Sequence, residues 1–142
     1  MRVGFTGTQT GLADSQVAAL ARVLVELGVS VLHHGSCIGG DAWAHYLARV
    51  IGARVELHPP VDRSRAADVD MFPGERVHRL RPYLVRNRHI VDACYVLVAC
   101  PREEHGETDR SGTWSTVRYT RRVGRPVIVV RPSGRIEREC CE

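Results

Sequence analysis

The residues best suited to chemistry in this sequence form one short run, Arg-Ser-Gly-Thr-Trp-Ser-Thr, at positions 110–116. The run follows an apolar stretch at positions 95–99 and precedes a helix-like segment that ends at Gly124. A glycine and small hydroxyl residues between a strand and a helix leave backbone N–H groups available, and a helix N-terminus carries partial positive charge. We therefore predict a phosphate-binding turn that uses Ser111, Gly112, Thr113, Ser115 and Thr116.

A glycine-rich turn near the start of the chain extends to Gly11. Its spacing matches neither the dinucleotide fingerprint nor the P-loop, and the chain has no lysine to complete a P-loop. By itself the turn is equally consistent with a tight strand-to-helix connection and with a cradle for phosphate or ribose. In the second interpretation the ligand contacts come from Gly7, Thr8 and Gln9.

A second glycine-rich turn, Gly-Ser-Cys-Ile-Gly-Gly-Asp, occupies positions 35–41. We predict that Asp41 caps the helix that follows. His45 lies four residues further on, on the same helix face. No nucleophile accompanies this pair, so we expect a structural hydrogen bond between Asp41 and His45. The predicted ligand contacts in this turn are Gly35, Ser36, Gly39, Gly40 and Asp41.

Two further segments supply candidate side chains. Arg86 and Asn87 lie on a predicted helix, where they either belong to a solvated face or reach a phosphate and a base or ribose. An acidic loop follows the apolar stretch at 95–99; it is a solvated loop, a lid, a cation site or a source of carboxylates for acid–base chemistry. If the chain is an enzyme, the catalytic candidates are Arg86, Glu103, Glu104 and Glu107.

Alternating strands and helices position these segments. Strand-like runs at 2–6, 29–33, 54–57, 94–99 and 126–130 are separated by helical patterns. We predict an α/β fold: a single Rossmann-like three-layer domain over residues 1–132, with a mostly parallel five-stranded sheet and helices on both faces, and a flexible tail at 133–142. The glycine turns then meet at the carboxyl edge of the sheet, where such folds bind ligands.

Composition narrows the classes of partner. All 20 basic residues are arginine, the net charge is +4, and the arginines form no dense block, which argues against a long polyanion track. We see no apolar run long enough for a membrane span and no leader, and the five cysteines are odd in number, so we expect a reduced, cytoplasmic protein without membrane contact. Adjacent His33 and His34 point to opposite faces of a strand. We therefore predict no metal, and we predict no cofactor.

The order of these motifs resembles the SLOG superfamily, which unites the DNA-processing-protein A family with the LONELY GUY phosphoribohydrolases. The resemblance covers residues 2–130 and rests on the turn at 35–45, on Arg86-Asn87-Arg88, on the run at 110–116 and on Gly124-Arg125-Pro126. It implies a Rossmann-like fold with a phosphate-binding edge.

The same resemblance bears on activity. The phosphoribohydrolases carry Pro-Gly-Gly-x-Gly-Thr-x-Glu-Glu at the last motif, and Ser115 and Thr116 stand here in place of the two carboxylates. We therefore predict binding or sensing of a small nucleotide or nucleotide derivative. The alternative is a nucleotide N-glycosidase that cleaves base from ribose 5-phosphate, in which Arg86 matches the arginine of that family. Single-stranded nucleic acid is a less favoured partner because no aromatic stacking series is present. A homodimer, as in related proteins, is left open.

Overall fold

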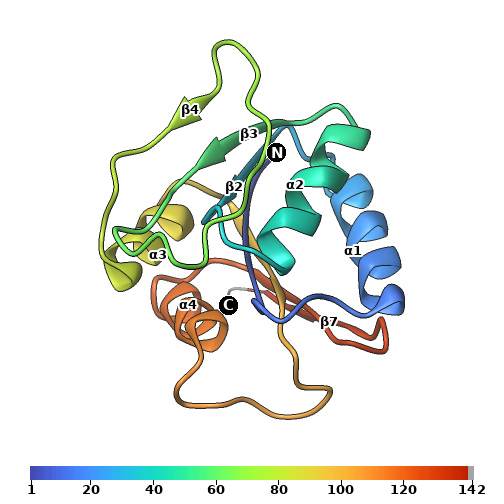
Figure 1. Ribbon diagram of the computed structural model, residues 1–142. Helices are drawn as coiled ribbons and strands as arrows, with labels where there is room; N and C mark the ends of the chain where they lie inside the picture. Colours follow the sequence, from blue (N-terminus) through green and yellow to red (C-terminus); the bar gives the residue numbers. More distant parts are fainter. Residues whose placement is uncertain (141–142) are drawn as a thin grey trace.

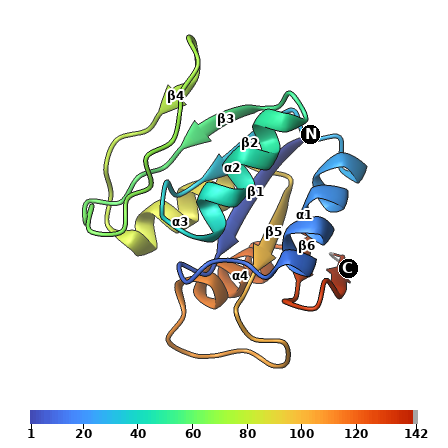
Figure 2. The same ribbon diagram turned by 45° about the vertical axis from the view of Figure 1, so that its right-hand side comes forward.

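A computed structural model describes residues 1–140 and shows one twisted sheet with helices on both faces (Figures 1 and 2). The sheet has seven strands in the order β4-β3-β2-β1-β5-β6-β7. All pairs are parallel except β6 with β7. The strands are β1 (Arg2–Gly7), β2 (Val31–His34), β3 (Arg54–Leu57), β4 (Arg76–Val77), β5 (Val96–Cys100), β6 (Val127–Val130) and β7 (Ile136–Glu139).

Four helices cover the sheet in two layers. They are α1 (Asp14–Glu26), α2 (Gly40–Val50), α3 (Tyr83–Asp92) and α4 (Gly112–Arg122). Helices α1 and α2 lie on one face and α3 and α4 on the other (Figure 1). Strand β5 packs against both helix layers: Val96 and Val98 belong to the α1/α2 core, whereas Leu97 and Ala99 belong to the α3/α4 core. A strand that is buried on both faces consists of a continuous run of apolar residues, as β5 does.

The predicted number of five strands is wrong, because β4 and β7 were missed. Strand β4 has only two residues and both are exposed, so no periodicity could reveal it. Strand β7 lies in the segment expected to be a flexible tail, and it pairs antiparallel with β6 along its whole length. An edge strand can be polar, as Ile-Glu-Arg-Glu is, because one side of it faces solvent. Residues 141–142 of that expected tail lie outside the described residues.

The strand order reverses between β1 and β5. From β1 the chain moves outward through β2, β3 and β4, then crosses back to β5 on the other side of β1. The carboxyl ends of β1 and β5 thus flank the crevice at which open α/β sheets bind ligands. Among the residues that the structure describes, no helix is long and apolar enough to cross a membrane.

Candidate functional site

A cleft of about 680 Å³ opens at the carboxyl edge of the sheet, at this reversal of strand order. Its size lies within the range of small-ligand pockets. Five segments of the chain form it: the end of β1 with the turn after it, the turn after β2, the segment 62–65, helix α3, and the loop that leads into α4. The predicted site residues that line the cleft are Gly7, Thr8, Gln9, Gly35, Asp41, Arg86, Asn87, Glu103, Ser111, Gly112 and Thr113.

The other predicted residues do not line the cleft. Ser36 is buried, and its carbonyl oxygen accepts a hydrogen bond from Ala67 N. Thr116 is also buried, and its hydroxyl donates to Gly112 O at 2.8 Å within α4. Gly39, Gly40 and Ser115 likewise fall outside the cleft lining.

Gly39 and Gly40 serve a packing role. Gly40 N donates to Thr8 O at 2.8 Å, and a Cβ at Gly40 would lie 3.0 Å from the Cα of Gly7. Gly39 has φ 85°, and a Cβ there would lie 2.5 Å from Thr8 O. Glycine at these positions lets the N-terminus of α2 pack directly against the turn after β1. The glycines hold two walls of the cleft together.

Arg86 forms the base of the cleft. Its side chain is only 7% exposed, and Nη1 donates to Gly35 O at 2.6 Å and to His58 O at 3.1 Å. Nε donates to Asn87 Oδ1 at 2.8 Å. A Cβ at Gly35 would lie 2.0 Å from Nη1, so glycine is what makes room for the guanidinium. The turn after β2 and helix α3 are therefore joined through one buried positive charge.

Asp41 does not cap α2 and does not contact His45, so both of those expectations are wrong. The N-cap residue is Gly39, and Asp41 Oδ2 accepts a hydrogen bond from Cys37 N at 3.1 Å. His45 instead joins His34 Nε2 at 2.9 Å and Asp70 Oδ1 at 3.0 Å. Asp41 and His45 lie on the same helix face, but they do not pair, because β2 and the loop around position 70 offer His45 better-placed partners.

The carboxyl of Asp41 is buried beside the cleft. Burial raises its pKa to about 6, and the positive charge of Arg86 and backbone hydrogen bonds only partly oppose this. Near neutral pH this group is thus a carboxylate close to its titration point. It can accept a hydrogen bond, and it can take up a proton.

The start of α4 presents unpaired backbone donors to the cleft. Ser111 is the N-cap, and its Oγ accepts from Trp114 N at 3.4 Å. The N–H groups of Gly112 and Thr113 precede the helix's own hydrogen-bond ladder and have no intrahelical acceptor. A Cβ at Gly112 would meet nothing within 4 Å, so the space beside this turn is open.

Of the three glutamates proposed as catalytic candidates, only Glu103 lines the cleft. Its Oε1 accepts from Trp114 Nε1 at 2.7 Å and its Oε2 accepts from Arg102 Nε at 3.0 Å. Burial opposes ionisation of this carboxyl, but these hydrogen bonds outweigh it and lower the pKa of Glu103. Glu104 binds Ser133 and Glu107 binds Arg121, so both are occupied elsewhere.

Sequence reasoning missed one wall of the cleft. The segment 62–65, which lies between β3 and β4 in the chain, contributes Asp62, Ser64 and Arg65. Ile38 N donates to Arg65 O at 2.9 Å, and Cys37 forms an isolated bridge with Ala66. No local pattern signals this contact, because a single bridge between two loops has no period.

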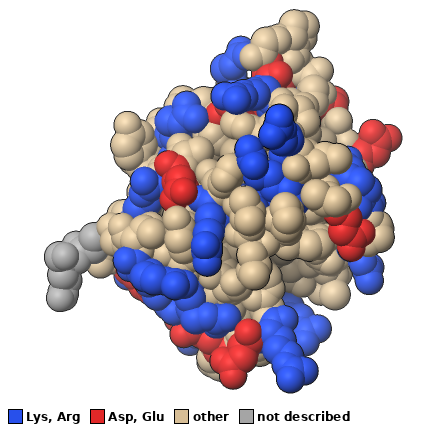
Figure 3. All heavy atoms as spheres, turned by 90° about the vertical axis from the view of Figure 1, so that its left-hand side faces the viewer, with Lys and Arg blue, Asp and Glu red and all other residues tan. Residues whose placement is uncertain are grey.

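The cleft is positive on balance. Four arginines line it, at positions 65, 86, 102 and 110, against the three carboxyls of Asp41, Asp62 and Glu103. On the outer face at the left of Figure 1, arginine side chains stand in several groups, with other residues and acidic side chains between them (Figure 3). The charge therefore suits a compact anion better than an extended track.

No protein-family model and no curated protein matches this sequence. Solved structures do. The molybdenum cofactor binding protein from Rippkaea orientalis matches with a TM-score of 0.68 and 20% identity, over 92% of this chain and 76% of that one. The Moco carrier protein from Chlamydomonas reinhardtii matches with a TM-score of 0.60 and 19% identity, over 90% and 74%.

DNA processing protein A from Streptococcus pneumoniae matches with a TM-score of 0.65 and 19% identity. The match covers 90% of this chain and 49% of that protein, so the chain spans about half of it. At these identities the likeness is one of fold. The chain has the Rossmann-like α/β fold that these structures share, as the motif resemblance predicted.

Proposed function

We propose that this chain binds a small nucleotide or nucleotide derivative in the cleft. The observation that carries the proposal is the meeting of the N-terminal turn of α4 with four arginines at the carboxyl edge of the sheet. Backbone N–H groups, the partial positive charge of the helix end and guanidinium groups all favour a phosphate. The phosphate then lies against Gly112 and Thr113, within reach of Arg110.

Groups beside the turn at the start of α4 and elsewhere in the cleft suit a sugar and a base. Glu103 is held in place by Trp114 and Arg102 and carries a lowered pKa, so it is an ionised acceptor for ribose hydroxyls. Thr8 and Asn87 add neutral hydrogen-bonding groups. Tyr83 and Leu84 at the start of α3 supply an apolar surface for a base. This arrangement supports a ligand with a phosphate, a sugar and a flat ring.

Glu103 is also the observation that favours the second candidate, a nucleotide N-glycosidase. Cleavage of a base from ribose needs a carboxylate near the sugar to stabilise positive charge or to activate water. The last motif lacks its carboxylates at Ser115 and Thr116, but a glutamate from the preceding loop lies in the same cleft. Binding remains the favoured function, because it needs no further group.

The test is calorimetry with nucleoside mono- and diphosphates, ADP-ribose, a short oligonucleotide and the molybdenum cofactor, the last because two structural neighbours are named for it. Released base is followed by chromatography in parallel. Arg110→Gln should weaken phosphate-dependent binding about tenfold, the loss of one charged hydrogen bond. Arg22→Gln on α1, an exposed arginine outside the cleft, is the matched control.

The outcomes separate the candidates. Heat with a mononucleotide and no released base supports binding, whereas base release that Glu103→Gln abolishes supports the glycosidase. Heat only with the oligonucleotide, with a steep inverse dependence on salt, contradicts both and indicates a nucleic-acid binder. Binding of the molybdenum cofactor alone would replace the nucleotide as the ligand. An Arg110→Gln variant that binds as tightly as Arg22→Gln would contradict the proposed phosphate position.

A further inference from the structure

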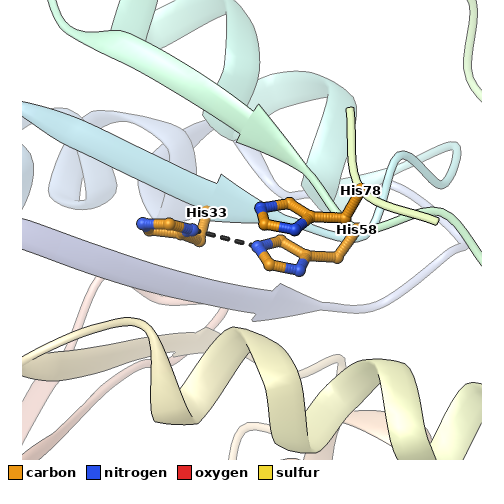
Figure 4. Close-up of side chains that lie close together, drawn as sticks. All are labelled: His33, His58 and His78. Carbon is orange, nitrogen blue, oxygen red and sulfur yellow. Dashed lines mark hydrogen bonds between the residues drawn. The ribbon is translucent and has the colours of Figure 1, made fainter. Parts of the chain in front are cut away.

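We propose that His33, His58 and His78 form a binding site for one divalent transition-metal ion such as Zn²⁺, separate from the cleft. The three side chains come together from distant parts of the sequence (Figure 4). One ring nitrogen from each lies within 4.8 Å of the others. None of these histidines is among the described residues that line the cleft.

Neighbouring strands hold the three residues in place. His33 lies within β2, His58 follows the last residue of β3, and His78 follows the last residue of β4. His58 N donates to His34 O and His78 N donates to Leu57 O, each at 2.8 Å, so the sheet ladder continues through both positions. Ligands on adjacent strands form a more rigid site than ligands on loops.

The ring nitrogens already converge. His33 Nδ1 lies 3.0 Å from His58 Nε2, and the rings of His58 and His78 stack with centroids 4.0 Å apart at an angle of 11°. Figure 4 shows the stacked rings pointing the same way, toward His33. Zinc–nitrogen bonds of about 2.0–2.1 Å set tetrahedral ligand atoms roughly 3.4 Å apart. A small tilt of the stacked rings brings them to this spacing.

The cluster leaves polar atoms without partners. Among residues 1–140, His58 Nδ1 and His78 Nε2 are two of the three buried side-chain polar atoms that make no hydrogen bond. A carboxylate oxygen of Glu56 lies 3.5 Å from His78 Nε2 without forming one. Buried polar groups are normally satisfied, so an orphaned imidazole nitrogen inside a group of three histidines needs an explanation. A metal ion bound by His78 Nε2 supplies it for that atom, whereas His58 offers the ion Nε2, the nitrogen that faces His33 Nδ1.

Glu56 supplies the outer support that metal-bound histidines usually have. Its Oε2 lies 3.1 Å from His33 Nε2, the nitrogen that faces away from the other two rings, and Arg2 Nη2 donates to the same oxygen at 2.9 Å. Arg2 Nη2 also lies 3.0 Å from His33 Nε2, and since a guanidinium only donates, this nitrogen can accept from Arg2 when Nδ1 carries the proton. With the ion on Nδ1 of His33, the proton lies on Nε2 and is donated to Glu56. This is the carboxylate–histidine–metal pattern, which orients the ring and raises its basicity.

The ligands are in the right protonation state. Burial lowers the pKa of His33 to about 4 and that of His58 to about 2, and burial also lowers the pKa of His78. Neutral imidazoles keep a lone pair for an ion, so no net proton is released; the proton between His33 Nδ1 and His58 Nε2 moves to the other nitrogen of its ring. Imidazole nitrogen suits Zn²⁺, Cu²⁺ and Ni²⁺, whereas Mg²⁺ and Ca²⁺ prefer oxygen.

The test uses the full chain with Cys140→Ser and Cys141→Ser, so that thiols near the C-terminus cannot hold the ion. After chelator treatment, Zn²⁺ titration by calorimetry should give one bound ion per chain. Co²⁺ should give the visible absorption bands of a nitrogen-coordinated four- or five-coordinate ion. His78 is the most exposed of the three histidines. The substitution His78→Gln should weaken Zn²⁺ binding about 100-fold, the upper end of the losses seen when residues that support metal ligands are changed. His105→Gln, in an exposed loop, is the matched control and should leave binding unchanged.

Two results would overturn the proposal. One is a parent protein that binds no Zn²⁺ at hundreds of micromolar; the other is His78→Gln binding as tightly as His105→Gln. If His78→Gln fails to fold, histidine-ring ¹⁵N NMR of the parent decides, because bound Zn²⁺ must shift the ring nitrogens of these three histidines and not of His105. No nucleotide is added at any stage, so the outcome is independent of the proposed function.

Discussion

Substitution of Gly35 by alanine should displace the buried side chain of Arg86 at the base of the cleft. The new Cβ would lie 2.0 Å from Arg86 Nη1 and 2.5 Å from Cζ, whereas ordinary contacts begin at 3.4 Å. The guanidinium must therefore move by about 1.4 Å, which breaks its bonds to Gly35 O and His58 O. Hydrogen bonds to charged groups contribute about 1.5–3 kcal/mol each, so the loss of two should lower the free energy of unfolding by about 3–6 kcal/mol.

A double-mutant cycle isolates this cause. In an Arg86→Ala background the clash has no partner, so Gly35→Ala should then cost less than about 1 kcal/mol. Gly112→Ala is the matched control, because its Cβ would meet nothing within 4 Å and its stability should change little. Urea unfolding followed by circular dichroism measures all four chains of the cycle and the control. An equal cost of Gly35→Ala in both backgrounds would refute the reasoning, since the loss could not then arise from Arg86.

Three further predictions concern other parts of the molecule. Folding raises the pKa of Asp41 from 3.8 to about 6, so the folded state holds this proton more tightly and the free energy of unfolding falls as the pH rises from about 4 through 6. The variant Asp41→Asn should lose up to roughly 3 kcal/mol of this pH dependence. Identical urea midpoints at every pH for the two proteins would contradict the prediction. Glu103→Ala leaves Trp114 Nε1 without its acceptor and should cost about 1–3 kcal/mol, whereas Glu103→Gln keeps an acceptor and should cost less; equal thermal shifts would count against that bond. Deletion of residues 136–142 removes β7 and exposes the apolar edge of β6, so the melting temperature should fall and light scattering should rise, and an unchanged melting curve would mean that β7 adds no stability.

Local patterns were sufficient for the central part of the fold. The runs at 2–6, 54–57 and 126–130 match β1, β3 and β6 closely because apolar periodicity is a property of neighbouring residues. The helix predicted to carry Arg86 and Asn87 is α3, whose N-cap is Pro82. The alternation of strands and helices, together with turns at their ends, was enough to predict a parallel sheet and its ligand-binding edge.

The hydrogen-bond partners of individual side chains could not be predicted from the sequence in the same way. Asp41 and His45 share a helix face, but each finds its partner on another segment, Cys37 for the first and His34 with Asp70 for the second. Thr116 was assigned to the ligand because of its hydroxyl, yet the carbonyl one turn earlier in α4 takes that hydrogen bond. Side-chain partners depend on distances across the fold, which spacing along the chain does not contain.

The sequence by itself determined the fold class and the place of the turn at Ser111, Gly112 and Thr113 beside the carboxyl edge of the sheet, because both follow from residue types and short-range spacing. Only the tertiary structure decided which glutamate faces the cleft, why Gly35 must be glycine, and that His33 meets His58 and His78. These three depend on residues separated by between 11 and 51 positions, brought together by strand order and by loop bridges. Packing across the sheet, rather than any local pattern, sets such contacts.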